Sequence, residues 1–399
     1  MATAMATTMT MTRAALTTLL VAASALAGCA KDPDYTIDNE GNEEPPDPGP
    51  PDWPRGLHVV GAHIEDGAGN TVLLHGVNRS GTEYKCVQAG NTMFDGPATD
   101  ASVLAMRNWP NINSVRIPLN ESCWLGINGV LETVSGERYK TAIKNYVLRL
   151  HKHDLIPILE LHWVGPGTTL ATRLQPMPDA DHAPAFWADV AMTFRDDDGV
   201  ILEPYNEPFP DGNRDSAAAW SCWRDGCTAN LSVPQGTPAA TYQAAGMQAI
   251  VDAIRGTGST HIILLGGVQY SNALTQWLAH KPNDPLGQLG AAWHLYNFNA
   301  CISPTCWDVA PAAVAAAVPI VASEIGQNDC MGAFIMPLMA WLDAHGAGYH
   351  AWAWNAFGAC TPGDARGRGG QPWSLITSYT TGAPNGGYAQ AFHDHVAAR

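Results

Sequence analysis

Two glutamates stand in settings suited to acid and nucleophile chemistry. Glu207 lies in the segment Glu-Pro-Tyr-Asn-Glu-Pro at 203–208, and Glu324 lies in Ala-Ser-Glu-Ile-Gly at 322–326. Cleavage of a glycosidic bond needs such a pair, because one carboxyl group protonates the leaving oxygen while the other meets the positive charge at the sugar carbon. In the retaining form of this reaction the two carboxyl groups lie about 5 to 5.5 Å apart. The chemistry therefore requires a fold that brings these two side chains together.

Elements able to carry the two glutamates recur along the chain. Short apolar segments alternate with stretches in which apolar residues recur three and four positions apart, and these patterns are typical of buried strands and of helices packed by one face. We expect helices over 139–150, 240–254 and 334–342, and strands over 72–77, 112–118, 156–162, 200–205, 261–266, 291–295, 319–323 and 348–354. The alternation predicts β/α units around a parallel sheet, and eight strands predict an α/β fold of the (β/α)8 TIM barrel type.

A shorter pattern of alternating apolar and polar residues accompanies the first barrel strand. Residues 57–74 alternate around the turn sequences Asp66-Gly67 and Gly69-Asn70, as is typical of a hairpin. We therefore expect a small N-terminal β-hairpin that caps one end of the barrel.

Polar and ionisable side chains gather at the carboxyl ends of the predicted strands. In a TIM barrel these ends and the loops after them build the active face. The residues found there are Asn78, Arg116, His162, Asn206, Glu207, His294, Tyr296, Glu324, Trp352 and Trp354. Glu207 follows the fourth strand and Glu324 the seventh, which face each other across a barrel of eight. Two side chains leaning over the mouth can therefore reach the separation that the retaining reaction needs.

The order of these residues resembles glycoside hydrolase family 5, the family of many cellulases and mannanases. The resemblance rests on Arg116 in the second strand, Asn-Glu-Pro at 206–208, His-x-Tyr at 294–296 and Glu324, and it covers about residues 57–399. The family belongs to a clan of retaining hydrolases, so the resemblance implies a glycosidase that cleaves a β-linked polysaccharide with retention of configuration.

The resemblance also implies roles around the two glutamates. Glu207 corresponds to the acid/base and Glu324 to the nucleophile. Arg116 resembles the arginine that steadies the nucleophile, Tyr296 the tyrosine whose hydroxyl contacts it, and Asn206 the residue that bonds the sugar 2-hydroxyl.

Three further positions resemble substrate-binding residues of the family. His162 and His294 resemble two histidines that contact the sugar. A tryptophan after the eighth strand resembles the floor of the subsite before the scissile bond; Trp352 and Trp354 both fit it, and we favour Trp352. The alternative for the histidines is a hydrogen-bonded packing role.

Glu160 departs from the family pattern, which often has an aspartate two residues before the histidine. We interpret Glu160 and Glu203 as buried supporting groups rather than catalysts. An alternative for Arg116 is that it merely neutralises one of these two carboxylates.

The composition narrows the class of partner. A net charge of -16 with only 21 Lys and Arg lacks the positive footprint that phosphate backbones require, so nucleic acid is excluded as a partner. We expect a monomer that binds a polysaccharide or oligosaccharide. Flat aromatic rings stack on sugars but also fill loop cores, and the loop tryptophans open to either use are Trp124, Trp163, Trp220, Trp223 and Trp307.

Eight cysteines follow Cys29, and an even number in an exported chain predicts disulfides. We predict the pairs 86 with 123, 222 with 227, 301 with 306 and 330 with 360. The second and third would be small loop staples, whereas the first and last would join the loops after neighbouring strands. The tight Cys-x2-Cys or His spacing of a zinc site is missing, so we expect no metal, and we expect no cofactor.

The N-terminal segment predicts export. Arg13 precedes an apolar run that ends in Leu-Ala-Gly-Cys at 26–29. This run is too short to span a bilayer and is typical of a signal peptide. The ending resembles a bacterial lipobox, with an ordinary cleavable signal as the alternative. We divide the chain into a lipoprotein signal peptide at 1–29, an acidic Pro-rich linker at 30–55 and a catalytic barrel at 56–399. The expected location is the cell envelope, with the lipid anchor as the only membrane contact, or the exterior.

Several activities fit this fold. An endo-β-1,4-glucanase is the leading prediction, because that activity is common in the family that the chain resembles. The alternatives are a β-mannanase, another β-glucanase, or an exo-acting galactofuranosidase or arabinofuranosidase, since loops graft function onto a barrel. The long loop at 164–183 could wall off one end of the cleft and make the enzyme exo-acting. The alternative from another functional class is a non-catalytic surface protein that only binds glycans.

Overall fold

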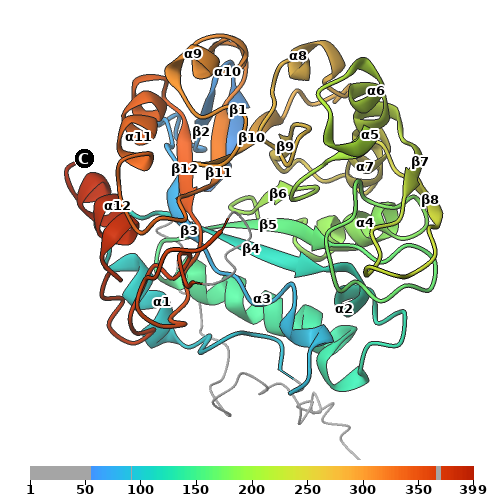
Figure 1. The fold of residues 1–399 in the computed structure, drawn as a ribbon, viewed down its shortest axis with the longest axis horizontal. Helices are drawn as coiled ribbons and strands as arrows, with labels where there is room; N and C mark the ends of the chain where they lie inside the picture. The colour runs from blue at the N-terminus through green and yellow to red at the C-terminus, as the bar shows by residue number, and fades with distance from the viewer. Residues whose placement is uncertain (1–54, 91, 365–369) are drawn as a thin grey trace, which may run out of the picture. The chain divides into compact units, whose positions relative to one another are not determined.

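A computed structural model describes residues 55–90, 92–364 and 370–399 (Figure 1). The predicted signal peptide and all but the last residue of the predicted linker lie outside the described residues, so these two predictions are untested. The C-terminal face of the barrel and its loops lie within them, apart from residues 91 and 365–369.

Eight parallel strands close into a barrel within the described ranges. In order around the barrel they are β3 (His75–Asn78), β4 (Ser114–Asn120), β5 (Ile156–Trp163), β6 (Ile201–Glu203), β9 (Ile263–Gly266), β10 (Leu289–Tyr296), β11 (Ile320–Gly326) and β12 (Gly348–Ala351), which pairs with β3. Each overlaps one of the eight predicted strands, and the (β/α)8 prediction is confirmed. Every residue of β4 is buried, including the polar Ser114, Arg116 and Asn120 that alternate with its apolar residues.

Helices surround the strands (Figure 1). The longer ones are α1 (Asp100–Arg107), α3 (Glu137–Lys152), α4 (Ala183–Thr193), α6 (Ala217–Asp225), α7 (Met247–Gly256), α11 (Ile335–Ala344) and α12 (Gly387–Ala397). Shorter segments are α2 (Glu121–Leu125), α5 (Pro210–Asn213), α8 (Trp277–His280), α9 (Pro304–Trp307) and α10 (Ala310–Ala315), with 3-10 turns at Lys85–Val87 and Glu132–Val134. None of the described helices combines the length and apolar character needed to cross a membrane.

The register of neighbouring strands brings polar residues side by side. His294 of β10 is level with Glu324 of β11, and Glu160 of β5 is level with Glu203 of β6. Because parallel strands carry their carboxyl ends to the same edge of the sheet, these pairs share one end of the barrel. The chemistry-bearing residues therefore converge where the sequence predicts the active face.

The opposite end of the barrel is closed by the predicted hairpin. Strand β1 (His58–Val60) pairs antiparallel with β2 (His63–Glu65), and an isolated bridge joins Glu65 to Thr71 across the turn at 66–70. Its apolar side chains join a cluster with residues at the beginnings of the barrel strands; the cluster includes Leu57, Ile64, Leu74, Ile156, Ile201, Ile262 and Val321. The cap prediction is thus confirmed, with a core that excludes water from the barrel floor.

The predicted helix over 240–254 is wrong in its first part. Strand β8 (Thr241–Ala244) pairs antiparallel with β7 (Cys227–Asn230), and α7 begins only at Met247. The residues of β8 alternate between exposed and buried, and its Tyr242 hydroxyl donates to Met177 O at 2.6 Å. Figure 1 shows this hairpin outside the ring of barrel strands.

The long loop at 164–183 is fastened to that hairpin. Ala180 N donates to Gln243 O and Ala245 N donates to Pro178 O, each at 2.8 Å. Backbone hydrogen bonds therefore hold this loop against the hairpin.

All four predicted disulfides are present: Cys86–Cys123, Cys222–Cys227, Cys301–Cys306 and Cys330–Cys360. The first joins the loop after β3 to helix α2 after β4, and the last joins the loops after β11 and β12. Two bridges thus tie together the loops of neighbouring barrel strands at the active face.

Candidate active site

Arg116 is the centre of a buried hydrogen-bond network. Its Nη1 donates to Glu324 Oε1 at 2.7 Å and to Asn78 Oδ1 at 2.9 Å. Its Nε and Nη2 donate to the two oxygens of Glu203 at 3.0 and 2.9 Å, and Nη2 also reaches Asn206 Oδ1 at 2.9 Å. A guanidinium with five donors in a fixed plane suits this multiple contact. Arg116 therefore both contacts the expected nucleophile and neutralises a supporting glutamate, so the two interpretations of its role hold together.

The charges around Arg116 compensate one another. Burial lowers the pKa of Arg116, but Glu160, Glu203 and Glu324 outweigh it and hold the pKa above its usual value. Burial raises the pKa of Glu203, but Arg116 and His294 lower it to about 2. Glu203 is thus a permanent carboxylate, which supports its interpretation as a supporting group.

Glu324 is oriented by two donors. The Tyr296 hydroxyl donates to Oε2 at 2.6 Å while Arg116 occupies Oε1. Burial of this carboxyl raises its pKa, but the charges of His294 and Arg116 outweigh burial and lower it. An ionised carboxylate that is fixed in position and almost sealed from water is chemically equipped to attack a carbon atom.

His294 joins the two glutamates. Its Nδ1 lies 3.1 Å from Glu207 Oε1 and 3.7 Å from Glu324 Oε2. Its Nε2 lies 3.2 Å from the Ser323 hydroxyl, which donates to Glu203, so both ring nitrogens face acceptors. Burial lowers the pKa of His294, but Glu324, Glu203 and Glu207 outweigh it and raise it to about 9. The ring is therefore a cation at neutral pH.

The two expected catalytic carboxyls are close but differently exposed. Carboxylate oxygens of Glu207 and Glu324 lie within 4.8 Å of each other, with a His294 ring nitrogen within the same distance of both. The Glu207 side chain is 21% exposed and that of Glu324 is 4% exposed. Glu207 thus has access to solvent, as a proton-transfer group that activates water needs, whereas Glu324 is shielded.

His162 and Trp352 line the same end of the barrel. The His162 Nδ1 atom lies 2.9 Å from Glu160 Oε2, and although burial lowers the His162 pKa, Glu160 raises it to about 8. The His162 and Trp352 rings stack at 5.6 Å with an interplanar angle of 15°. Trp352 is half-buried, so one part of its surface is open to a ligand.

Trp354 does not line the site, and its assignment as a substrate-binding residue is wrong. Its ring is fully buried and packs edge-on against Trp109 at 5.0 Å and 70°. Strand β12 ends at Ala351, so the alternation of a strand does not extend to Trp354, which turns into the core instead.

Four of the five loop tryptophans also belong to the core. Their exposed fractions are 0 to 1%; they are Trp124, Trp220, Trp223 and Trp307. Trp220 and Trp223 pack edge-on at 5.3 Å within α6, so they brace the helix rather than a sugar. Trp163 is only half-buried at the end of β5 and stays a candidate for sugar contact.

Sequence patterns missed an aromatic group beside Tyr296. Phe298 stacks on Tyr296 at 5.2 Å and 15°, and Trp373 packs edge-on against Tyr296 at 5.3 Å and 83°. Phe298 is 39% exposed. Its position two residues after Tyr296 in the same loop was an available signal, whereas Trp373 lies far from any strand end in the sequence and offered none.

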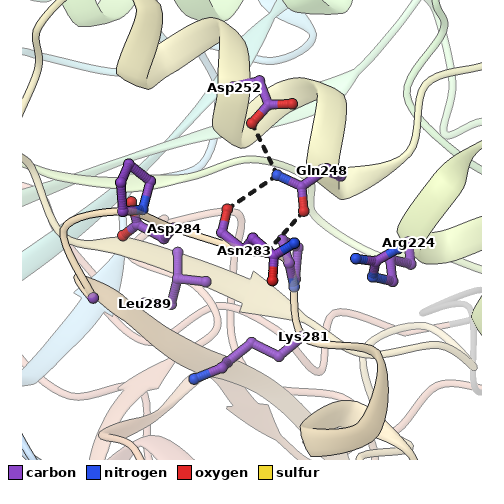
Figure 2. A pocket seen from close by; sticks show the side chains of 10 residues that line it. Arg224, Gln248, Asp252, Lys281, Asn283, Asp284 and Leu289 are labelled. Atoms are coloured by element: carbon purple, nitrogen blue, oxygen red, sulfur yellow. Dashed lines mark hydrogen bonds between the residues drawn. The ribbon is translucent and has the colours of Figure 1, made fainter.

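One polar cavity away from the carboxyl ends of the strands has no assigned function. It has a volume of about 670 Å³ and is lined by residues that include Arg224, Gln248, Lys281 and Asn283. Figure 2 shows Gln248 bridging Asp252 and Asn283, whose hydrogen bonds satisfy its amide. No aromatic side chain lines it, and three of its polar residues, Gln248, Asp252 and Asn283, bond one another.

A family comparison decides between the classes of function left open by the sequence. The sequence profile of Cellulase (glycosyl hydrolase family 5) matches residues 67–358, which is more than half of the 399 residues. The chain belongs to this family. It is a glycosidase, and the non-catalytic alternative is set aside.

Solved structures share the fold of this family 5 glycosidase. A β-glucanase from Saccharophagus degradans aligns with a TM-score of 0.60 at 16% identity over 87% of this chain and 94% of its own. A β-mannanase from Streptomyces thermolilacinus aligns at 0.57 and 19% identity over 86% and 95%. An endo-β-1,4-glucanase from Xanthomonas axonopodis pv. citri aligns at 0.55 and 16% identity over 82% and 99%. No curated protein sequence matches the chain.

Proposed function

We propose that this family 5 glycosidase is a retaining endo-β-1,4-glucanase with Glu324 as nucleophile and Glu207 as acid/base. The observation that carries the mechanism is the approach of their carboxylate oxygens to within 4.8 Å. Retaining enzymes hold the two carboxyl groups about 5 to 5.5 Å apart, whereas inverting enzymes leave about 6.5 to 9.5 Å for a water molecule.

The proposed reaction has two displacements. A Glu324 oxygen bonds to the anomeric carbon as the bond to the glycosidic oxygen breaks, and Glu207 gives its proton to that oxygen. Water then gives a proton to Glu207 while its oxygen displaces Glu324 from the same carbon. Each step inverts the configuration, so the product keeps the β configuration.

The neighbouring side chains support these roles. Arg116 and Tyr296 hold the two oxygens of Glu324, and the His294 cation lies beside both glutamates. When Glu324 leaves the sugar as a carboxylate, these donors are already in place, so little reorganisation is needed.

A cavity bordered by the segment that follows Glu207, from Phe209 onward, suits the leaving part of the substrate. It has a volume of about 500 Å³ between the loop after β6 and strand β7, and its lining includes Phe209, Arg214, Thr228 and Asn230. Phe209 lies two residues after the proposed acid and stacks on Tyr270 at 4.7 Å. A polar cavity with an aromatic wall is chemically suited to a sugar, so we assign it to the leaving-group side.

The choice of β-1,4-glucan is tested by a substrate panel. Structural relatives include a glucanase solved with cellotetraose and a mannanase solved with mannohexaose, so both glycans belong in the panel together with xyloglucan, mixed-linkage glucan and nitrophenyl glycosides. We expect cleavage of soluble cellulose into several oligosaccharide sizes. Preference for mannan, or release of a single small sugar from chain ends, would contradict the proposed activity.

Stereochemistry tests the mechanism whatever the sugar is. Proton NMR of the earliest product should show the β-anomer before mutarotation. An early α-anomer from a β-linked substrate would contradict the assignment of Glu324 as nucleophile.

We also propose that the enzyme is exported and anchored through Cys29, because the apolar run and Leu-Ala-Gly-Cys at 26–29 fit a lipoprotein signal. The full chain expressed in a bacterium should partition with membranes, and Cys29→Ala should release it. Equal partition of both proteins would contradict the anchor.

A further inference from the structure

Glu83 is a buried acid next to the active site that the proposed mechanism does not use. It lies in the loop after β3 and is 3% exposed. Its Oε2 accepts the Gly81 N–H at 2.6 Å. The backbone N–H of Glu83 itself is a further donor to this carboxyl. Among the described residues no other side chain donates a hydrogen bond to it, so the carboxyl is held by backbone groups of its own loop alone.

The backbone that carries Glu83 is fixed from several directions. Asn120 Nδ2 donates to Glu83 O at 2.7 Å, and the Tyr139 hydroxyl donates to Thr82 O at 2.8 Å. Cys86, three residues on, is bonded to Cys123. These contacts join the loop to β4, α2 and α3, so the position of the carboxyl is set before any ligand arrives, which reduces the entropy lost on binding.

Gly81 explains how the loop reaches this position. Its φ is +130°, and a Cβ atom there would lie 2.6 Å from Asp95 Cβ. Only glycine adopts this conformation without strain and fits this space. The Gly81 N–H that holds Glu83 thus depends on the residue type at position 81.

Glu83 lies on the side of the site formed by His162 and Trp352. The charges of Glu83 and Glu324 both act on His162, which stacks on Trp352. The next residue after Glu83, Tyr84, packs 6.4 Å from Trp163. The family resemblance implies that Trp352 underlies the sugar before the scissile bond, and on that assignment Glu83 lies on the non-reducing side of the substrate.

No arginine or lysine is ion-paired with Glu83 among the described residues. Burial raises its pKa to about 7, because it outweighs the favourable charge of His162 and the hydrogen bond from Gly81. A buried carboxyl that no arginine or lysine neutralises costs stability in the free protein. Groups kept in such a state are candidates for a role in ligand binding.

We propose that Glu83 binds a hydroxyl group of the sugar on the non-reducing side of the scissile bond through its carboxyl group, and so acts as a substrate-binding residue of the enzyme. A sugar hydroxyl both donates and accepts, so it pairs with the carboxyl in either protonation state. This inference rests on the proposed function for the direction of the substrate. It adds a contact from the loop after the first strand to those from the other strand ends.

The test measures oligosaccharide affinity in an inactive background. Wild-type activity on the substrate panel first identifies the glycan that is cleaved; cellotetraose is the probe if it is β-1,4-glucan, and mannotetraose if it is mannan. Calorimetry then compares Glu324→Gln with the double variants that add Glu83→Ala or Glu83→Gln. We expect Glu83→Ala to weaken binding about 10- to 100-fold, as for loss of a hydrogen bond to a charged group, and Glu83→Gln to restore most of the affinity.

The matched control is Glu121→Gln in the same background. Glu121 is also a buried carboxyl that accepts a glycine N–H, from Gly165 at 2.8 Å, but it faces Asp179 instead of the site. We expect unchanged affinity and a midpoint of thermal unfolding close to that of the parent. Unchanged affinity in Glu83→Ala, or an equal loss in the Glu83→Gln variant with normal folding, would overturn the proposal. A wild-type enzyme that cleaves no β-glycan of the panel would instead refute the proposed function.

Discussion

Buried carboxyl groups occur in two regions of this glycosidase under opposite conditions. In the site, Glu203 and Glu324 surround the Arg116 cation, and the pKa of each is lowered despite burial. In the wall of the barrel, Glu121 and Asp179 are equally buried, but burial raises the pKa of both and no arginine or lysine pairs with either in the described ranges.

The hydrogen-bond partners of the wall carboxyls explain why their pKa values differ from those of Glu203 and Glu324. Glu121 Oε1 and Asp179 Oδ2 are sealed from solvent and no third group donates to them, but the two side chains form a hydrogen bond with each other. Their other oxygens accept backbone N–H groups from Gly165 and His182. Two carboxyls that face each other without a cation share one proton, since both cannot be ionised. The same residue type is thus ionised beside Arg116, where we propose Glu324 as the nucleophile, and neutral in the wall, where it has a structural role.

The largest expected effect is at the ionised carboxylate. Glu324→Ala removes the atom that bonds to the sugar, so we expect kcat to fall on the order of 10⁵-fold on polysaccharide and aryl glycosides alike. Glu121→Ala, which removes an equally buried carboxyl from the wall, is the control and should retain kcat wherever it folds. A Glu324→Ala enzyme that kept substantial activity on aryl glycosides would contradict the nucleophile assignment.

Removing the proposed acid/base should depend on the leaving group. Glu207→Ala should lower kcat on polysaccharide by roughly 10² to 10⁴-fold, but less on an aryl glycoside whose leaving group needs no proton. Azide should then restore turnover and yield a β-glycosyl azide, because it replaces water at the glycosyl-enzyme. Equal losses on both substrates without azide rescue would argue against Glu207 as the acid/base.

The residues of the site that lie within a strand or near its end could be predicted from the sequence. Arg116, His294 and Glu324 each interrupt or end a buried apolar segment, where a polar group is conspicuous. The strands themselves were predictable for the same reason, since residues buried on both faces form short continuous apolar runs.

What failed depended on contacts distant in the sequence. Trp354 belongs to the core because Trp109 packs against it, and β8 is a strand because β7 supplies its partner. Trp220 and Trp223 were predictable in part, since their spacing of three places them on one face of α6. Glu83 belongs to no motif, and only the fold brings it next to His162.

Replacing Arg116 should leave the carboxyls of the site buried without a cation, as the carboxyls of the wall are, but with more carboxyl groups close together. Arg116→Met leaves Glu160, Glu203 and Glu324 buried without it, so we expect the free energy of unfolding to fall by about 3 to 5 kcal/mol. Chemical denaturation measures this loss, and adding Glu203→Gln should recover part of the stability but no activity. Arg255→Met, which breaks the buried pair with Asp284 away from the site, is the control that loses stability while kcat stays normal. Unchanged stability of Arg116→Met would contradict the role of Arg116 in holding Glu203 and Glu324 ionised.

The smallest expected effect concerns the wall carboxyls, where neutralising Glu121 should raise the free energy of unfolding instead of lowering it. Because the folded-state pKa values of Glu121 and Asp179 are raised, the folded protein holds a proton that the unfolded chain releases above about pH 4. This contribution to stability is fully present below the unfolded pKa and is lost as the pH rises toward the folded pKa. Glu203 and Glu324, whose pKa values are lowered, behave in the reverse way: their contribution is present above the unfolded pKa and is lost as the pH falls toward the folded pKa, which for Glu203 is about 2. Glu121→Gln keeps a neutral donor facing Asp179, so it should raise the free energy of unfolding by about 1 kcal/mol at pH 8 and leave it nearly unchanged at pH 4. Denaturant titrations of both proteins across this range measure the difference, and a variant that is destabilised equally at both pH values would show that the two wall carboxyls do not share a proton.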